Sequence, residues 1–222
     1  WVVHASLRST NMSPKNKVII LMLLFYGCRV GELRLAKKSD FDFNNDLWFI
    51  PADNHKMGGR TRRAIVRPII PQIKPFLKYI FSLSPNSYKF AFPNLKGKAY
   101  TMLSKGFQTS IPQHVDINIK KRFSVDIPNW TMHDLRRTMR THIAGLAPPH
   151  ICEIMLGHGL PQVWGTYDLN EYLEPQAQAY EKWFTKLCAI LDNYDRFDIS
   201  GSISNDSKNP FVSSQEATAL RP

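Results

Sequence analysis

The organisation of this chain follows from one stretch, Thr131-Met132-His133-Asp134-Leu135-Arg136-Arg137-Thr138. It predicts the start of a helix, because Thr131 is a suitable N-cap and Asp134 stands three residues later, as in a capping box. His133 and Arg136 are three positions apart and therefore project from the same face of that helix. Free backbone N–H groups and the positive end of the helix dipole favour an anion there. The stretch thus indicates a phosphate-binding site, although H-x-x-R alone fits a solvated arginine beside a half-buried histidine equally well.

The composition indicates a polyanionic partner. The 222 residues include 29 Lys and Arg against 18 Asp and Glu, a formal net charge of +11. Such a balance suits DNA, RNA or an acidic membrane surface, and charge alone does not choose among them. The longest apolar run, residues 18–26, is about half of the ~20 residues that a membrane helix needs. We therefore expect no membrane span, and no signal peptide is visible.

The cysteines and histidines indicate neither disulfides nor a metal site. The three cysteines, Cys28, Cys152 and Cys188, are odd in number, widely spaced and set in apolar contexts. This pattern is typical of reduced, buried thiols in a cytoplasmic protein. A metalloprotein using the chain's histidines is the alternative, with candidate ligands His133, His142, His150 and His158. Their spacings match no HExxH or Cys/His zinc pattern, so we expect no metal.

The hydrophobic pattern predicts a mainly α fold with a small antiparallel β-hairpin, an α+β class. Ser13-Pro14 is a cap followed by proline at the first helical position, and the apolar residues after it predict a helix inside the core, ended by Gly27. The predicted helices cover residues 14–26, 29–36, 71–83, 101–110, 131–144, 149–156 and 174–191. Residues 47–50 and 63–67 have strand composition, and residues 111–129 are expected to be irregular.

The turn of the predicted hairpin is long, glycine-bearing and strongly basic. Residues 53–67, which run from this turn through the predicted strand after it, carry five cations against Asp53 alone. They are Lys56, Arg60, Arg62, Arg63 and Arg67. A basic hairpin tip can follow a nucleic-acid backbone, and a solvated turn is the alternative interpretation.

Five features stand in order along the chain. They are Gly27-x-Arg29-x-Gly31-Glu32-Leu33, Lys56 in the hairpin turn, His133-x-x-Arg136-Arg137-Thr138, Leu156-Gly157-His158, and Tyr167 nine residues after His158. In this order they resemble the catalytic domain of the tyrosine recombinase (phage integrase) family over about residues 13–191. Residues 163–174 are similar to the integrases of prophages and genomic islands.

The resemblance implies a role for each motif residue. Arg29 and Arg136 match the family's two phosphate-clamping arginines, and guanidinium suits that task because it is planar, always charged and bidentate. Tyr167 matches the nucleophile, which forms a 3′-phosphotyrosyl bond that stores the energy for religation. Lys56 matches the general acid for the departing 5′-oxygen. His133 and His158 match the assisting positions, and no cofactor or metal is implied.

Some assignments stay open at this stage. Arg60 or Arg62 could replace Lys56, and Tyr172 or Tyr180 could replace Tyr167. Arg29 could be only a surface partner of Glu32, which we otherwise expect to brace it. His158 could simply cap its helix. The expected DNA contacts outside the catalytic set come from Arg60, Arg62, Arg63 and Arg137.

The resemblance also implies an organisation and a biological role. We expect a linker over residues 1–12, a catalytic domain over 13–192 and a disordered tail over 193–222. The family's upstream DNA-binding domain is absent, and the start at Trp1 indicates a fragment. The expected function is integration and excision of a mobile element in bacterial cytoplasm, at the nucleoid. A type IB topoisomerase and a non-catalytic DNA-binding relative are the alternatives.

The expected partner is double-stranded DNA carrying attachment sites. The expected working form is a homotetramer on that DNA, with the helix over 174–191 docking on a neighbour, and a monomer or weak oligomer when free. The geometric expectation is sharper. Arg29, Arg136 and His158 should converge within one phosphate's reach of the N-terminus of the His133 helix, and Tyr167 should face that point.

Overall fold

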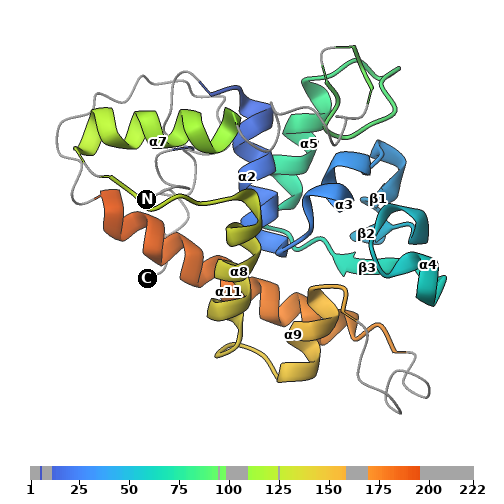
Figure 1. The fold of residues 1–222 in the computed structure, drawn as a ribbon. Helices are drawn as coiled ribbons and strands as arrows, with labels where there is room; N and C mark the ends of the chain where they lie inside the picture. Colours follow the sequence, from blue (N-terminus) through green and yellow to red (C-terminus); the bar gives the residue numbers. More distant parts are fainter. Residues whose placement is uncertain are drawn as a thin grey trace, which may run out of the picture.

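A computed structural model describes Ser6 and residues 12–94, 96–98, 110–124, 126–158 and 170–195. The structure is mostly helical with one small antiparallel sheet, which confirms the predicted α+β class (Figure 1). The elements are α2 (Pro14–Tyr26), α3 (Val30–Leu35), η1 (Lys38–Asp40), β1 (Phe41–Asp42), β2 (Leu47–Ile50), η2 (Ala52–Asn54), α4 (Gly58–Thr61), β3 (Ile65–Pro68), α5 (Lys74–Ser82), α7 (Ser110–Phe123), α8 (Met132–Ile143), α9 (Pro149–Met155) and α11 (Leu173–Asp195). Among the described helices, none has the length and apolar character to cross a bilayer.

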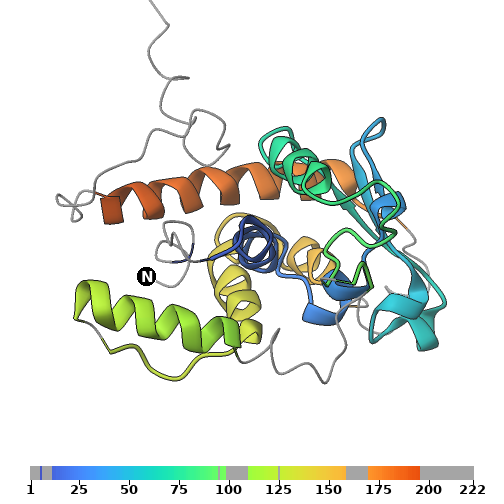
Figure 2. The same ribbon diagram turned by 90° about the horizontal axis from the view of Figure 1, so that it is seen from above.

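Helix α2 is the centre of the core. The Ser13 hydroxyl accepts a hydrogen bond from the Asn16 N–H at 3.3 Å, and Pro14 follows the cap, so the helix begins where the sequence predicts. Every residue from 18 to 26 is buried. A helix that is apolar all round needs neighbours on all sides, and the view down α2 in Figure 2 shows α5, α7, α8 and α11 around it. The chain leaves α2 through Gly27, whose φ of 57° is left-handed.

The sheet has the strand order β1-β2-β3, with both pairings antiparallel. The predicted hairpin is confirmed, since β2 pairs with β3 and Ile50 lies opposite Ile65. Strand β3 begins two residues later than predicted. The two-residue strand β1 was not predicted. The basic turn is not an open loop, because it contains η2 and α4.

Helix α8 begins as the sequence predicts. The backbone N–H of Thr131 donates to Asp134 Oδ2 at 2.8 Å, the reciprocal half of a capping box. Its buried residues are Met132, Leu135, Arg136, Met139 and Ile143, so Arg136 lies on the stripe that packs inward. Helix α9 is followed by Gly157 at φ 67°, as expected for a left-handed C-terminal glycine.

The predicted irregular stretch over 111–129 is wrong, because residues 110–123 form α7. Among its described apolar side chains, Pro112, Val115 and Ile119 are buried, whereas Ile117 is 65% exposed. The stripe that packs inward is narrow and includes a proline, so it is a weak helix signal in the sequence. Trp130 Nε1 donates to Asp116 Oδ1 at 2.6 Å and joins the next segment to α7. The predicted helix over 101–110 lies outside the described residues except for its last position.

The other boundaries shift by a few residues. Helix α5 begins at Lys74 rather than at 71, and α11 reaches Asp195, which corrects a tail predicted to begin at 193. The rest of that predicted tail, and all but Ser6 and Met12 of the predicted N-terminal linker, lie outside the described residues.

Gly27 generates a testable prediction. In Gly27→Ala the new Cβ would lie 2.9 Å from Met139 Sδ and 3.0 Å from Leu156 Cδ2, in a left-handed conformation. We expect the free energy of unfolding in urea to fall by about 1–2 kcal/mol from the backbone conformation alone. Gly31→Ala is the matched control, because Gly31 is helical with nothing within 4 Å of an added Cβ. It should be neutral or stabilising, by up to about 1 kcal/mol. Equal losses in both variants would contradict this account.

Candidate active site

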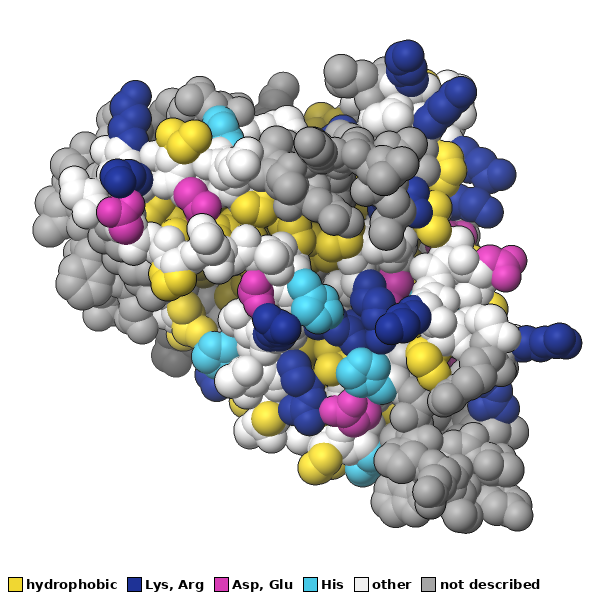
Figure 3. All heavy atoms as spheres, in the orientation of Figure 1, with side chains coloured by type: hydrophobic (Ala, Val, Ile, Leu, Met, Phe, Trp, Pro, Cys, Tyr) yellow, Lys and Arg dark blue, Asp and Glu magenta, His cyan; other side chains and the backbone are white. Residues whose placement is uncertain are grey.

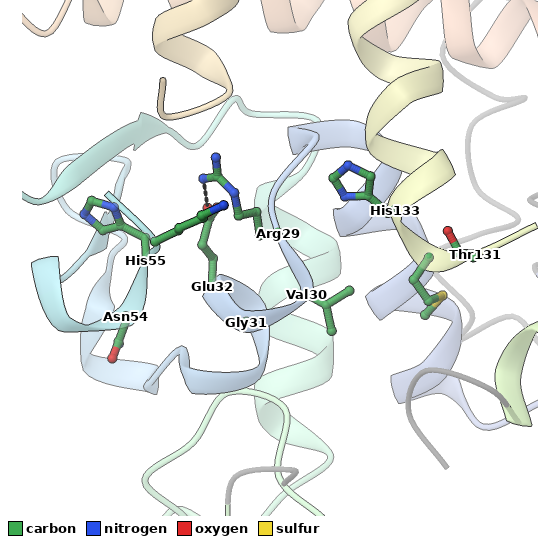
Figure 4. Close-up of a pocket in the computed structure, with 10 residues that line it drawn as sticks. Arg29, Val30, Gly31, Glu32, Asn54, His55, Thr131 and His133 are labelled. Atoms are coloured by element: carbon green, nitrogen blue, oxygen red, sulfur yellow. Dashed lines mark hydrogen bonds and ion pairs between the residues drawn. The ribbon is translucent and has the colours of Figure 1, made fainter. Parts of the chain in front are cut away.

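Arg29 stands at the N-cap of α3, directly after the turn at Gly27. Its Nη1 lies 3.0 Å from Glu32 Oε1, so the predicted brace is confirmed. The Glu32 side chain is fully buried, whereas that of Arg29 is 22% exposed. Figure 4 shows that the Arg29 side chain lies between the hairpin connection and α8.

Arg67 is a residue behind the site whose burial the sequence does not indicate. It lies on a strand, as predicted, but it does not belong with the exposed cations of residues 53–67, because its side chain is completely buried. Its Nη2 lies 3.0 Å from Glu32 Oε2, and its Nε donates to the Met155 carbonyl at 3.1 Å. The signal was the strand register, because Arg67 lies opposite the buried Trp48 and its guanidinium stands 5.2 Å from that ring's centroid.

Glu32 is therefore a buried carboxylate between two arginines. Desolvation by itself would raise the pKa of the Glu32 carboxyl, but Arg67 and then Arg29 outweigh it and hold that pKa below the usual 4.5. The carboxylate is charged at neutral pH, and it offsets the charge of Arg67 in the core.

Arg136 reaches from α8 into the junction of three segments. Its Nη1 donates to the Gly27 carbonyl at 2.7 Å, and its Nη2 donates to the Leu156 carbonyl at 2.9 Å. The same Nη2 lies 2.8 Å from His158 Nε2. These contacts use three of the five N–H donors of a guanidinium, so two remain for a ligand. Desolvation, followed by the charge of Arg29, lowers the pKa of Arg136 to about 10, which leaves it protonated at neutral pH.

A cleft of about 510 Å³ lies in front of Arg29. Its lining residues are Arg29, Val30, Gly31, Glu32, Asn54, His55, Lys56, Thr131, Met132 and His133. Figure 4 shows Arg29 between His133, at the start of α8, and His55, on the hairpin connection. Three predicted site residues, Arg29, Lys56 and His133, thus line one cleft, although they are far apart in the sequence.

The imidazole of His133 is held toward its neutral form. Desolvation and then the charges of Arg136 and Arg137 lower the pKa of His133 from 6.5. A neutral imidazole accepts a proton or a hydrogen bond at neutral pH, as a general base requires.

The sequence did not single out His55, whose Nε2 donates to the Arg63 carbonyl at 2.9 Å and so holds the hairpin connection.

His158 follows the left-handed Gly157 and meets Arg136, as described above. Its Nδ1 lies 2.6 Å from Glu153 Oε2. Glu153 was also missed by the sequence analysis. Its pairing with His158 spans five residues across the end of α9, a separation that no helical periodicity predicts.

The geometric expectation can be compared directly with these positions. Arg136 contacts His158, and Arg29, Lys56 and His133 share the cleft beside them. Tyr167 lies outside the described residues, so its place remains a prediction. The alternative Tyr180 is fully buried against Phe25 and Tyr26, a position unsuited to a nucleophile for DNA.

The predicted DNA-contacting arginines differ in their surroundings. Arg62 and Arg63 are exposed on the hairpin connection, and the side chain of Arg60 lies outside what the structure describes. Arg137 is 73% exposed and pairs with Asp134 at 2.8 Å. In Figure 3 basic and histidine side chains gather where α8 and α9 face the sheet.

In the described part of the chain, no group of three or more His, Cys, Asp or Glu could hold a metal ion.

The comparisons with known proteins concern the family and the fold. The family model described as "Phage integrase family" matches residues 3–171. The chain is similar in fold to a Tn1549 transposon integrase in complex with circular intermediate DNA, with a TM-score of 0.56 and 17% identity over 72% of this chain and 55% of that one. It also resembles XerA recombinase, with a TM-score of 0.52 and 17% identity over 84% of this chain and 60% of that one.

A third similar structure is a lambda integrase tetramer bound to a Holliday junction, with a TM-score of 0.51 and 16% identity over 76% of this chain and 47% of that one. The chain thus spans about half to three-fifths of the length of these proteins. Among curated protein sequences, none matches it significantly.

The buried Glu32 generates a second prediction. In Glu32→Gln the buried Arg67 loses its counter-charge, so the free energy of unfolding at pH 7 should fall by about 3–5 kcal/mol. Because the folded pKa of Glu32 lies below its unfolded value, the carboxylate stabilises the fold above about pH 4.5 and loses this effect as the pH falls. The gap between wild type and variant should therefore narrow in urea unfolding below that pH.

Asp126→Asn is the matched control for the same change of carboxylate to amide. Asp126 pairs with Lys120 on the surface, where the two side chains are 79% and 69% exposed. Such pairs contribute little, so its unfolding should stay close to that of wild type. A similar loss in the two variants would show that the burial of Glu32 is not what matters.

Proposed function

We propose, since the chain belongs to the phage integrase family, that it is the catalytic domain of a site-specific recombinase, formed by about residues 13–192. It would cut and rejoin DNA through a covalent phosphotyrosine. One observation carries the proposal. Arg29, Lys56 and His133 line a single cleft at the N-terminus of α8, where Arg136 contacts His158.

The scissile phosphate would bind between Arg29 and Arg136. Attack on phosphorus puts additional negative charge on the non-bridging oxygens, and charged, preorganised donors stabilise that charge best. Arg136 is preorganised by its two backbone carbonyl contacts, and Arg29 by Glu32. Bidentate guanidinium donors supply the positive charge that a divalent ion supplies in other phosphoryl-transfer sites.

The nucleophile would be Tyr167, from its spacing of nine residues after His158. Its Oη attacks phosphorus, a P–O(Tyr) bond forms, and the bond from phosphorus to the 5′-oxygen breaks. The phenol proton goes to a base, for which neutral His133 is suited, and Lys56 in the cleft gives a proton to the departing 5′-oxygen. The reverse reaction reseals the strand without ATP, because the phosphotyrosine keeps the energy of the broken bond.

The substrate would be double-stranded DNA carrying attachment sites. The formal charge of +11 and the exposed Arg62, Arg63 and Arg137 suit a phosphate backbone, and we assign Arg60 to the same surface from its place in the hairpin. The Tn1549 and lambda integrase structures were obtained with DNA, the latter as a tetramer on a Holliday junction. By analogy, we propose that this chain acts as a homotetramer in the integration and excision of a mobile element.

The nucleophile is testable with a nicked suicide substrate, from which the fragment with the free 5′-hydroxyl diffuses away and traps the intermediate. Wild-type chain should form a covalent protein–DNA adduct that survives denaturing electrophoresis, with or without a chelator. Tyr167→Phe should form none, because it lacks the attacking oxygen, whereas Tyr172→Phe should keep the adduct. An adduct that survives in Tyr167→Phe and disappears in Tyr172→Phe would move the nucleophile to Tyr172.

The two neighbouring arginines on α8 should behave differently in the same assay. Arg136→Ala should lower the rate constant of cleavage of bound DNA by on the order of a hundredfold or more, the usual effect of losing a preorganised donor. Arg136→Lys keeps a charge but not the bidentate geometry and should also be strongly impaired. Arg137→Ala should instead weaken DNA binding and lower its salt dependence by about one phosphate contact. Equal effects on cleavage rate would argue against Arg136 as the clamp.

A further inference from the structure

Four side chains at the edge of the site form a continuous chain of hydrogen bonds. Arg140 on α8 donates from Nε to Glu153 Oε1 on α9 at 3.0 Å, and its Nη2 lies 2.9 Å from the same oxygen in an ion pair. Glu153 Oε2 then lies 2.6 Å from His158 Nδ1, and His158 Nε2 lies 2.8 Å from Arg136 Nη2. Each carboxylate oxygen of Glu153 therefore serves a different partner, and the chain begins and ends on the same helix.

The partners of the two ring nitrogens of His158, Arg136 and Glu153, together determine which nitrogen carries the proton. A guanidinium only donates, so His158 Nε2 must accept from Arg136. A carboxylate only accepts, so His158 Nδ1 must carry the proton that it donates to Glu153. Both contacts require the same neutral tautomer, with the proton on Nδ1. The opposite tautomer would leave two donors facing each other at one end and two acceptors at the other.

The backbone of His158 is held separately from its ring. Gly157 has a φ of 67°, and a Cβ there would lie within 2.4 Å of Ile65 Cδ1, so the chain passes close against β3 at this point. The His158 N–H donates to the Glu153 carbonyl at 3.0 Å. The backbone contacts thus fix the position of His158, and the contact with the Glu153 carboxylate fixes the orientation of its imidazole ring.

The exposure of these groups indicates orientation rather than stability. The side chains of Glu153 and His158 are 34% and 40% exposed, and that of Arg140 is 36% exposed. Ion pairs at such exposure contribute little to stability, because water screens them. Desolvation acts against the charge of Glu153, but hydrogen bonds from His158 and Arg140 lower the pKa of its carboxyl below the usual 4.5 and keep it ionised.

We propose that Glu153 is a positioning residue for strand cleavage, which fixes His158 in the tautomer and orientation that present Nε2 to the Arg136 guanidinium. His158 then holds Arg136 in place for the phosphate, and Arg140 holds Glu153. This proposal deepens the proposed function and rests on it for its effect on cleavage. The tautomer itself is a property of the DNA-free chain.

The test uses Glu153→Gln in the full chain. The amide has nearly the same shape but can either donate or accept, so it no longer demands a proton on Nδ1. In the wild type, the ring nitrogens of His158 should show one Nδ1–H tautomer by long-range ¹H–¹⁵N NMR at neutral pH, and in Glu153→Gln a mixture. Cleavage of bound suicide substrate should slow by roughly tenfold to a hundredfold, as when the orienting partner of a ligand histidine is lost. The dissociation constant for DNA should change no more than in the control.

Glu181→Gln, an equal change of charge on the exposed face of α11, is that control and should resemble wild type in tautomer and cleavage. Arg140→Gln removes the brace while leaving the carboxylate, and should give a smaller change in the same direction. It also serves if Glu153→Gln fails to fold. A single Nδ1–H tautomer in Glu153→Gln, or tautomer mixing without slower cleavage, would overturn the proposal. If wild-type chain forms no adduct, the recombinase assignment fails instead, and the NMR comparison still decides whether Glu153 sets the tautomer.

Discussion

The site depends on the pair of hydrogen bonds from Arg136 to the carbonyls of Gly27 and Leu156. These carbonyls belong to the ends of α2 and α9, two segments that the sequence separates by more than a hundred residues. Helices expose unsatisfied carbonyls at their C-termini, and one guanidinium satisfies two of them here. The same contacts fix the direction of the remaining N–H donors of Arg136, so one side chain serves the fold and the proposed phosphate site.

Positive charge is concentrated behind the cleft, and the carboxylate of Glu32 offsets it. A buried arginine without a counter-charge would be strongly destabilising. Glu32 lies between Arg67, which is inside the core, and Arg29, which faces the cleft. The sheet thereby supports the site, because Arg67 on β3 also donates from Nε to the Met155 carbonyl, just ahead of Leu156 and His158.

The two histidines of the site are prepared for different tasks by their surroundings. Desolvation and then the neighbouring guanidiniums lower the pKa of His133, which lines the cleft, and favour its neutral form. His158 lies between an arginine and a carboxylate, which fix the direction in which each ring nitrogen points.

The sequence by itself determined the order of the five motifs and several helix ends, because caps and glycine turns depend on neighbouring residues. The Ser13 and Thr131 starts and the Gly27 and Gly157 turns are such cases. It did not reveal α7, whose buried apolar stripe is narrow and includes a proline. Only the tertiary structure decided that Arg67 is buried and that Glu153 contacts His158, since both depend on which segments meet in space.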